Sequence, residues 1–253
     1  MGMSPWLEAW VSNQGLAAFE AWHPEQTGWN GLENSCDLAP GWCPSRRVLK
    51  THAPAQLAPW VGGTERDGMN GARVIVVTRN PKDAAVSHYH HTIDLPHIFK
   101  YNGCWDYFLR KIWIPGKVES GSFWEWHQSW WQVCQGGSVD LLWISYEELL
   151  SEPEKSISRV TKFIGLEPTT ELTKGVLTAS NFQAMKQTAA EEDDKLVAIG
   201  KADQVKRNHI REGKSGSWTE AFTAPQNELM DRYHMGECSR LSLPPKLLPQ
   251  MSL

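Results

Sequence analysis

The sequence predicts an α/β fold in three layers, with a parallel central sheet flanked by helices. Two segments, RVIVVT (73–78) and VDLLWISY (139–146), are continuous apolar runs, which is typical of strands buried on both faces. A helical pattern follows each run, so strands and helices alternate along the chain. In such sheets the ligand lies beyond the carboxyl ends of the strands. The residues that follow each strand are therefore the first candidates for a functional site.

The remaining elements are shorter or less regular. The expected strands are residues 46–52, 73–78 and 139–146, and the expected helices are residues 6–19, 80–93, 151–165 and 225–238. Ser151 and Glu154 suggest a capping box for the third of these helices, and Gly165 is suited to end it. Residues 181–186 predict a short helical turn, and the polar residues 187–217 predict a long loop.

The composition is that of a globular protein. Of 253 residues, 41% are hydrophobic and 21% are charged, which excludes a disordered chain. We expect a single domain over residues 1–240 and a loosely held tail at 241–253, which contains three prolines. The net charge of −4 gives no field for gathering nucleic acid, so we expect no nucleic-acid partner.

The cysteines and the apolar runs bear on the cellular location. Five cysteines without a CxxC motif argue against structural zinc and against a disulfide framework, and they favour a reducing cytosol. The start MGMSPW has no basic region followed by an apolar run, so no signal peptide is expected. No apolar run approaches the length that spans a membrane. The sequence thus predicts a cytoplasmic protein without a membrane partner.

Arg79 stands at the carboxyl end of the strand at 73–78, directly before a helix. Asn80 is a good N-cap, Pro81 fits the first helical position, and Asp83 stabilises the first turn. A helix start offers free N–H groups, and a guanidinium beside it forms bidentate bonds to phosphate. Ser87, two turns on, can donate a further hydrogen bond. On these residues alone, pairing of Arg79 with a surface carboxylate explains the pattern equally well.

Lys50 and His52 stand at the end of the strand expected at 46–52. Alternation along a strand directs both side chains to the same side of the sheet. A lysine that neutralises negative charge and a histidine that takes a proton together suit the transfer of an anionic group. Taken in isolation, a surface lysine and a structural histidine are the favoured interpretation.

Five segments follow one another in an order and spacing that resemble the landmarks of a known family. They are RVLKTHAPAQL (47–57), VTRNPKDAAVSHYH (77–90), SYEELLSEPEKSISRVTKFIGL (145–166), SNFQAM (180–185) and REGKSGSWTEAFTAPQNELMDRY (211–233). The family is that of the cytosolic sulfotransferases, and the resemblance covers residues 46 to 236. It implies the P-loop NTPase-like sulfotransferase fold and 3′-phosphoadenosine 5′-phosphosulfate (PAPS) as the donor. It also implies a small molecule with a hydroxyl or amine as the acceptor, and no metal.

The resemblance assigns a role to each matching residue. Arg79 and Ser87 would hold the 3′-phosphate of the donor, and Tyr146 would contact its adenine. The other positions matched to the nucleotide site are Ser180, Phe182, Met185, Arg211, Glu212 and Gly213. His52 would take the proton of the acceptor hydroxyl, and Lys50 would stabilise the sulfonate in transfer.

The chain departs from the family pattern at three places. The family's first strand and its 5′-phosphosulfate loop find no match, so we expect an N-terminally incomplete domain that lacks its first strand. Glu212 stands where the family's Arg-Lys-Gly motif has lysine, and a carboxylate weakens phosphate binding unless it points away. Only Thr223 and Glu228 remain of the family's dimer motif, which argues against the usual dimer contact. A non-catalytic protein, or a fragment that binds the nucleotide or a small apolar ligand, is therefore the alternative to an active enzyme.

Three further patterns are candidates for other sites. His88 and His91 lie one helical turn apart, but no carboxylate or cysteine nearby completes a metal site, so surface histidines are expected. GKSG (213–216) resembles the end of a Walker A motif, yet Asn208 stands where that motif requires glycine and no strand precedes it. Trp126 and Trp130 are at helical spacing and indicate core packing, with Trp124 or Trp126 as an alternative wall of an acceptor pocket.

Overall fold

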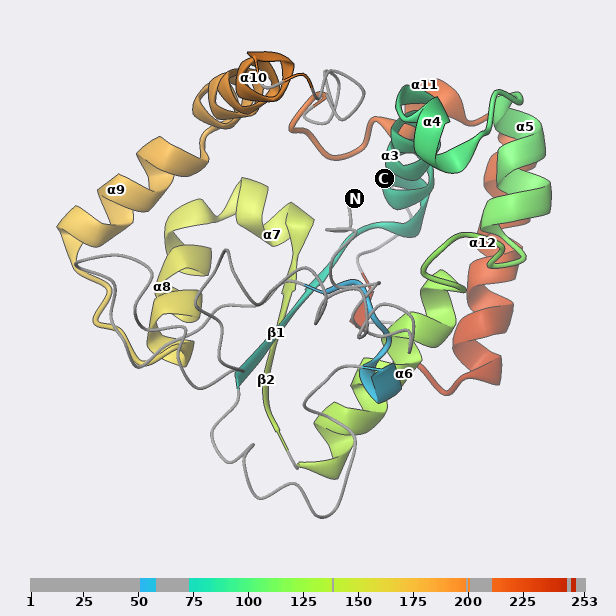
Figure 1. Cartoon of the computed structure of the whole chain (residues 1–253). Coiled ribbons are helices and arrows are strands. Elements are labelled where there is room, and N and C mark those ends of the chain that lie inside the picture. Colours follow the sequence, from blue (N-terminus) through green and yellow to red (C-terminus); the bar gives the residue numbers. More distant parts are fainter. Residues whose placement is uncertain are drawn as a thin grey trace, which may run out of the picture. The chain divides into compact units, whose positions relative to one another are not determined.

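The computed structural model describes residues 51–57, 73–137, 139–198, 200, 211–244 and 247–248 (Figure 1). The chain divides into two compact units, one formed mainly by residues 67–253 and the other by residues 2–66. In the smaller unit the structure describes a short 3₁₀ helix, η3 (Ala55–Leu57), and the residues before it. The expected helix at 6–19 and most of the strand expected at 46–52 lie outside the described residues, and Thr51 and His52 are not in a strand.

The larger unit contains a parallel pair of strands. Strand β1 (Arg73–Thr78) pairs with β2 (Asp140–Ser145) in a register that places Val76 opposite Trp143. Both strands lie where the sequence predicts them. The expectation that β1 is buried on both faces is wrong, because Val74 and Val76 are buried whereas Val77 is 51% exposed.

Helices make up most of the larger unit. In chain order they are α3 (Pro81–Asp94), α4 (Pro96–Phe99), α5 (Trp105–Tyr107), the π-helical segment η4 (Phe108–Trp113), α6 (Phe123–Gly136), α7 (Tyr146–Ser151), α8 (Pro153–Phe163), α9 (Thr170–Ser180), α10 (Phe182–Ala198), α11 (Trp218–Ala221) and α12 (Ala224–Arg240).

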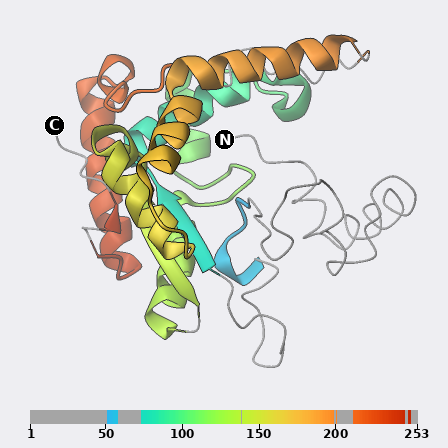
Figure 2. The same ribbon diagram turned by 90° about the vertical axis from the view of Figure 1, so that its left-hand side faces the viewer.

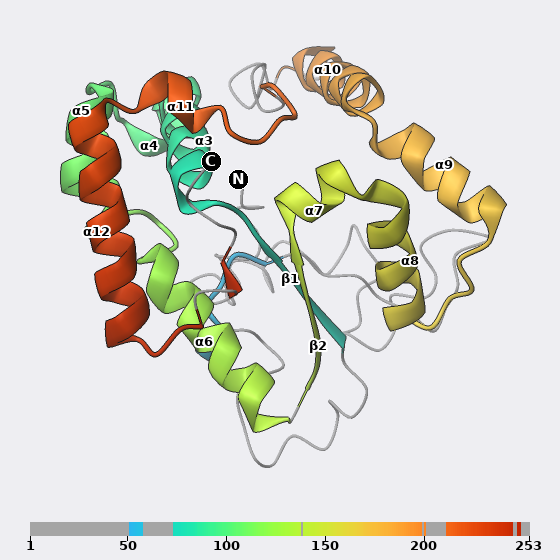
Figure 3. The same ribbon diagram turned by 180° about the vertical axis from the view of Figure 1, so that it is seen from behind.

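The helices are arranged in layers around the strands. The two strands lie between α8 on one side and α6 and α12 on the other (Figures 1 and 3). At their carboxyl ends the strands continue into α3 and α7, and α10 lies at that same end of the sheet (Figure 2). The predicted α/β class with helices on both sides of a parallel sheet is confirmed.

The hydrophobic core lies between α3, η4, α6 and α12. Trp124 and Met230 have no exposed surface, and Phe108 and Leu109 of η4 pack in the same cluster. Trp124 is therefore a core residue, and its indole Nε1 donates to His234 Nδ1 at 3.1 Å. The same cluster includes Leu243 and Leu248, which are 3% and 2% exposed. The expectation of a loosely held tail is wrong for these two residues, because their side chains complete this core.

The start of α8 differs from the prediction. Ser151 is the last residue of α7, and Glu152 at the N-cap of α8 makes no side-chain cap. The capping box lies one helix earlier, where Ser145 and Glu148 bond reciprocally at the start of α7. Gly165 follows the end of α8 at φ +75°, as expected of a residue that ends a helix in the left-handed region.

Helix α10 replaces the predicted short turn and the first part of the predicted loop. The Asn181 side chain accepts the N–H of Ala184 at 2.9 Å and so caps the start of α10. Good helix formers continue to Ala198, and Gln187 bonds to Glu191 one turn on at 3.0 Å. The polar composition that suggested a loop is that of an exposed helix. No helix in the described ranges is long and apolar enough to cross a membrane.

Candidate anion-binding site

Arg79 leaves the carboxyl end of β1 and is held by two other segments. Its guanidinium carbon lies 4.4 Å from the centre of the Tyr146 ring, and its Nη2 donates to the Lys214 carbonyl at 3.4 Å. Its Nε is buried and has no hydrogen-bond partner among the described residues. Burial raises the pKa of Tyr146, so the phenol stays neutral beside the cation. The guanidinium is thus oriented by an aromatic face and keeps a donor for a ligand.

No carboxylate in the described ranges forms an ion pair with Arg79. The alternative interpretation, in which Arg79 pairs with a surface carboxylate, therefore finds no support there. A half-buried guanidinium whose Nε is used by no described residue is suited to an anionic ligand.

The first turn of α3 is built as predicted, and the Asn80 cap satisfies one of its donors. The Asn80 side chain accepts the N–H of Lys82 at 2.8 Å, and the Asn80 N–H donates to Glu147 Oε1 at 3.0 Å. Pro81 occupies the first helical position, and the turn is buried. The expectation that the start of this helix offers free N–H groups to an anion is wrong for Lys82, because the Asn80 cap satisfies that group.

Asp83 fixes the segment 211–218 onto α3. Its carboxylate accepts the backbone N–H groups of Gly216 at 2.6 Å and Trp218 at 2.9 Å, and the Ser217 hydroxyl at 3.3 Å. Asp83 is 1% exposed, so these bonds satisfy a buried charge. The sequence indicated a role for Asp83 in the first helical turn, whereas its partners lie far along the chain.

The face of α3 that carries Asp83 also carries Ser87 and His90. Residues four and seven positions apart lie near one another on the surface of a helix. Burial and the nearby charge of Arg211 lower the pKa of His90, so this imidazole is neutral near neutral pH. The charge of Arg211 thus reaches α3 at His90, and the role of Ser87 stays a prediction.

Arg211 is already paired within its own segment. Its Nη1 donates to the carboxylate of Glu212, and its Nη2 donates to Ser217 Oγ at 3.3 Å. The second Glu212 oxygen lies 3.3 Å from Lys214 Nζ. The Glu212 carboxylate thus lies among the cations of the site and does not point away from them.

Gly213 brings α10 to this site. Its φ is +64°, and a Cβ at this position would overlap the Phe182 ring at the start of α10. Glycine is needed here for its backbone conformation and for the close approach of the ring. The structure therefore brings Phe182 next to the segment that contains Arg211.

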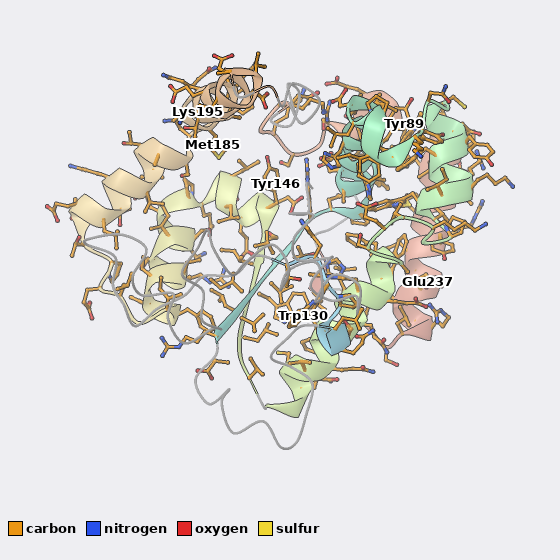
Figure 4. The ribbon with its side chains drawn as sticks, in the orientation of Figure 1. Tyr89, Trp130, Tyr146, Met185, Lys195 and Glu237 are labelled. Carbon is orange, nitrogen blue, oxygen red and sulfur yellow. The ribbon has the colours of Figure 1, made fainter. Side chains whose placement is uncertain are left out.

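The remaining predicted residues are Ser180, Met185, His52 and Lys50. The Ser180 hydroxyl donates to the Val176 carbonyl within α9 at 2.7 Å. Met185 is 39% exposed and lies on the side of α10 nearer α7 in the view of Figure 4, where Tyr146 begins α7. His52 belongs to the smaller unit, and Lys50 lies outside the described residues. The roles of these four residues stay predictions.

Three residues near the site were missed by the sequence analysis. Glu147 bonds to the Asn80 backbone, Lys214 offers its carbonyl to Arg79, and His90 lies in the field of Arg211. Glu147 follows Tyr146 at a strand end, which is a signal that sequence reading could use. A backbone carbonyl such as that of Lys214 leaves no signal in the sequence.

His88 and His91 are buried, so the expectation of surface histidines is wrong. His88 Nε2 lies 3.2 Å from Glu119 Oε2 and packs edge-on against Trp113. Burial opposes ionisation of Glu119, but the hydrogen bond with His88 holds the pKa of that carboxyl below its usual value. The described part of the chain contains no group of three potential metal ligands.

A buried histidine of α6 contacts the last residue of β1. Thr78 Oγ1 lies 2.9 Å from His127 Nε2, and His127 Nδ1 lies 2.7 Å from the Phe123 carbonyl. The carbonyl can only accept, so Nδ1 carries the proton and Nε2 accepts from the Thr78 hydroxyl. Burial lowers the pKa of His127 to about 4, so the ring is neutral.

Comparison with known proteins gives one consistent result. The model of a family described as "Sulfotransferase domain" matches residues 4–241. Sulfotransferase 1A1 of Bos taurus is 30% identical over 191 residues, which cover 76% of this chain and 61% of that protein. Sulfotransferase 6B1 of Pan troglodytes is 34% identical over 188 residues, which cover 74% of this chain and 56% of that protein. The chain spans about three-fifths of the length of these curated relatives.

Solved structures agree at the level of the fold. A mouse sulfotransferase, SULT7A1, complexed with PAP, aligns with a TM-score of 0.63 at 24% identity over 77% of this chain and 67% of its own. Retinol dehydratase in complex with androsterone and the inactive cofactor PAP aligns with a TM-score of 0.65 at 21% identity, over 83% of this chain and 58% of its own.

Proposed function

The chain belongs to the sulfotransferase family, and on that premise we propose that it transfers a sulfonate group from PAPS to a hydroxyl or amine of a small acceptor. The observation that carries the proposal is the orientation and bonding of the Arg79 side chain. Its guanidinium is oriented by Tyr146 and by the Lys214 carbonyl, and its buried Nε has no partner among the described residues. These residues fit a phosphate group, because a phosphate oxygen supplies the missing acceptor.

In the proposed complex the 3′-phosphate of the donor lies between Arg79, Ser87 and Arg211. Tyr146 and Phe182 contact the adenine, since both rings come from segments that meet at the carboxyl end of the sheet. Ser180, Met185 and Gly213 line the nucleotide in this proposal. The PAP-bound relatives support such a site, because PAP, adenosine 3′,5′-bisphosphate, is the donor after loss of its sulfonate.

The proposed chemistry is carried by His52 and Lys50. The acceptor oxygen forms a bond to sulfur while the bond between sulfur and the leaving phosphate oxygen breaks. His52 takes the proton that the acceptor hydroxyl loses, and Lys50 neutralises charge on the sulfonate during transfer. Replacing His52 by alanine should abolish transfer and leave nucleotide binding intact.

For the acceptor we propose a small, mainly apolar alcohol or phenol. One solved relative, retinol dehydratase, is complexed with androsterone in one structure and with retinol in another, and both ligands are of this kind. We propose the cytosol as the location of this activity, and the cysteine usage of the chain supports it.

Calorimetric titration with adenosine 3′,5′-bisphosphate tests the proposal. Wild type should bind, and Arg79→Ala should lose the binding, because the phosphate then has no oriented guanidinium. Arg232→Ala is the matched control, since Arg232 is an exposed residue of α12 outside the candidate site. Binding that survives in Arg79→Ala, or no binding by folded wild type, overturns the proposal.

A binding protein without turnover is the second candidate, favoured by the ion pair between Glu212 and Arg211. Transfer of radiolabelled sulfonate to a panel of phenols and alcohols separates the two. Turnover that depends on His52 supports the enzyme, whereas Arg79-dependent binding without turnover supports the binding protein.

A further inference from the structure

We propose that Glu212 is an internal competitor of the ligand phosphate and limits the preference of the site for 3′-phosphorylated nucleotides. The inference rests on the proposed function. Its basis is a closed set of charges within residues 211–220, in which each cation already has an anionic partner.

The contacts of Arg211 show which groups compete with a phosphate. Glu212 accepts from Nη1 of the guanidinium, and Ser217 accepts from Nη2. Each of these nitrogens carries two N–H groups, so a phosphate can bind Arg211 beside the Glu212 carboxylate or in its place. In both cases the phosphate and the carboxylate share one cation and repel each other, so Glu212 weakens the binding.

The rest of the segment holds Glu212 in place. Lys214 Nζ lies 3.3 Å from the second Glu212 oxygen and 3.3 Å from Glu220 Oε1, so Lys214 joins two carboxylates. Gly213, between Arg211 and Lys214, is packed against Phe182, and Asp83 fixes the backbone at Gly216. A pair held from both sides in this way competes more effectively than a mobile side chain, because little entropy is lost in forming it.

The balance of charge points the same way. Arg211 and Lys214 contribute two positive charges, and Glu212 and Glu220 contribute two negative ones. The segment therefore brings no net attraction to a phosphate until Glu212 is removed. The Arg211 and Glu212 side chains are each 28% exposed, so solvent screens this effect only in part.

The consequence is a site that discriminates weakly between nucleotides. With Glu212 in place, adenosine 3′,5′-bisphosphate gains little over adenosine 5′-monophosphate from Arg211, and Arg79 carries most of the preference. Neutralising Glu212 frees Arg211 for the 3′-phosphate and increases the preference for the bisphosphate.

The experiment compares Glu212→Gln with wild type and with Glu220→Gln at fixed ionic strength. Glutamine keeps the size of the side chain and removes its charge. Glu220→Gln is the matched control, because Glu220 pairs with Lys214 and not with Arg211. Dissociation constants for adenosine 3′,5′-bisphosphate and adenosine 5′-monophosphate are measured by calorimetry, and melting temperatures show that each variant is folded.

Glu212→Gln should bind the bisphosphate about five- to tenfold more tightly and the monophosphate less than about twofold more tightly, where tenfold corresponds to one freed charge-assisted contact. Adding Arg211→Ala should remove this gain, and Glu220→Gln should leave the ratio of the two constants unchanged. A merely structural role of Glu212 would shift both constants alike.

Two failures are distinguishable. If folded wild type and Glu212→Gln bind neither nucleotide, the proposed function is wrong and the inference falls with it. If wild type binds the bisphosphate through Arg79 but Glu212→Gln leaves the ratio of the two constants unchanged, only the inference is overturned.

Discussion

The Asp83 carboxylate on α3 accepts the backbone N–H of Trp218, 2.9 Å away and 135 residues later in the chain. Together with its bond to Gly216, this contact joins the first turn of α3 to the segment that contains Arg211. The bond from Arg79 to the Lys214 carbonyl is a second link, so the end of β1 and the start of α3 are both joined to the later segment.

Replacement of Asp83 by alanine should therefore cost both stability and binding. The backbone donors of Gly216 and Trp218 would be left without this acceptor, which predicts a loss of about 2–4 kcal/mol in the free energy of unfolding. Urea denaturation measures this loss. Glu228→Ala, an exposed position on α12, should change stability by less than about 0.5 kcal/mol. A change in Asp83→Ala as small as in this control would show that the contact does not hold the segment.

Removing the charge of the buried Lys82 and removing the charge of its partner Asp231 should lower the free energy of unfolding by different amounts. Its Nζ lies 2.6 Å from Asp231 Oδ1, and the side chains are 1% and 41% exposed. When Lys82→Met removes the cation, water can hydrate Asp231. When Asp231→Ala removes the anion, the buried Lys82 side chain loses this ion pair and keeps its contacts with Asn227 and the Trp218 ring.

We expect Asp231→Ala to lower the free energy of unfolding by about 2 kcal/mol and Lys82→Met by about 1 kcal/mol. Urea denaturation of both variants and of the double variant gives the coupling free energy between the two residues. Equal losses in the two single variants would contradict the assignment of the cost to an uncompensated buried charge.

Gly213→Ala should disturb the site for two separable reasons. An alanine at φ +64° costs about 1 kcal/mol in backbone conformation, and its Cβ overlaps the Phe182 ring. Adding Phe182→Ala should relieve the overlap and leave the backbone cost. Melting temperatures and nucleotide titration of the single and double variants measure the two effects. No recovery of stability in the double variant beyond that of Phe182→Ala alone would mean that the ring does not limit this position.

The sequence predicted the elements whose signals are local. The apolar run before Arg79 and the Asn80–Pro81 cap determine β1 and the start of α3, and both lie within one residue of the expected bounds. The polar residues of α10 carry no apolar stripe strong enough to separate an exposed helix from a loop, so its length was underestimated. Val77 was expected in a buried strand because an apolar run does not reveal how many neighbours cover each face.

For the site, sequence reading identified the types of residue better than their partners. Arg79 and Tyr146 were both named, and in the structure the guanidinium carbon of Arg79 lies 4.4 Å from the centre of the Tyr146 ring. The bonds of Asp83 to Gly216 and Trp218 were not predicted, because they join residues far apart in the sequence. Such contacts have no local pattern. His88 was assigned to the surface for the same reason, since Glu119 and Trp113 cover it from another segment.

We expect the free energy of unfolding to fall in mild acid because of the buried His127. The ring is 3% exposed, accepts from Thr78 and donates to the Phe123 carbonyl, and burial lowers its pKa from 6.5 to about 4. Between these two values the unfolded chain binds a proton at this residue and the folded chain does not. The stability that neutral His127 contributes is therefore present above pH 6.5 and is lost as the pH falls toward 4.

Between pH 7 and pH 5 this difference lowers the free energy of unfolding by about 2 kcal/mol. Urea denaturation at several pH values measures the slope in wild type and in His127→Gln, whose amide keeps an acceptor for Thr78 but has no proton to gain. The variant is expected to be less stable at pH 7, because it loses the bond to Phe123, but its stability should fall less steeply in acid. Since the comparison uses the slope, the fixed cost of the substitution cancels. Parallel slopes in the two proteins would show that His127 does not carry this pH dependence.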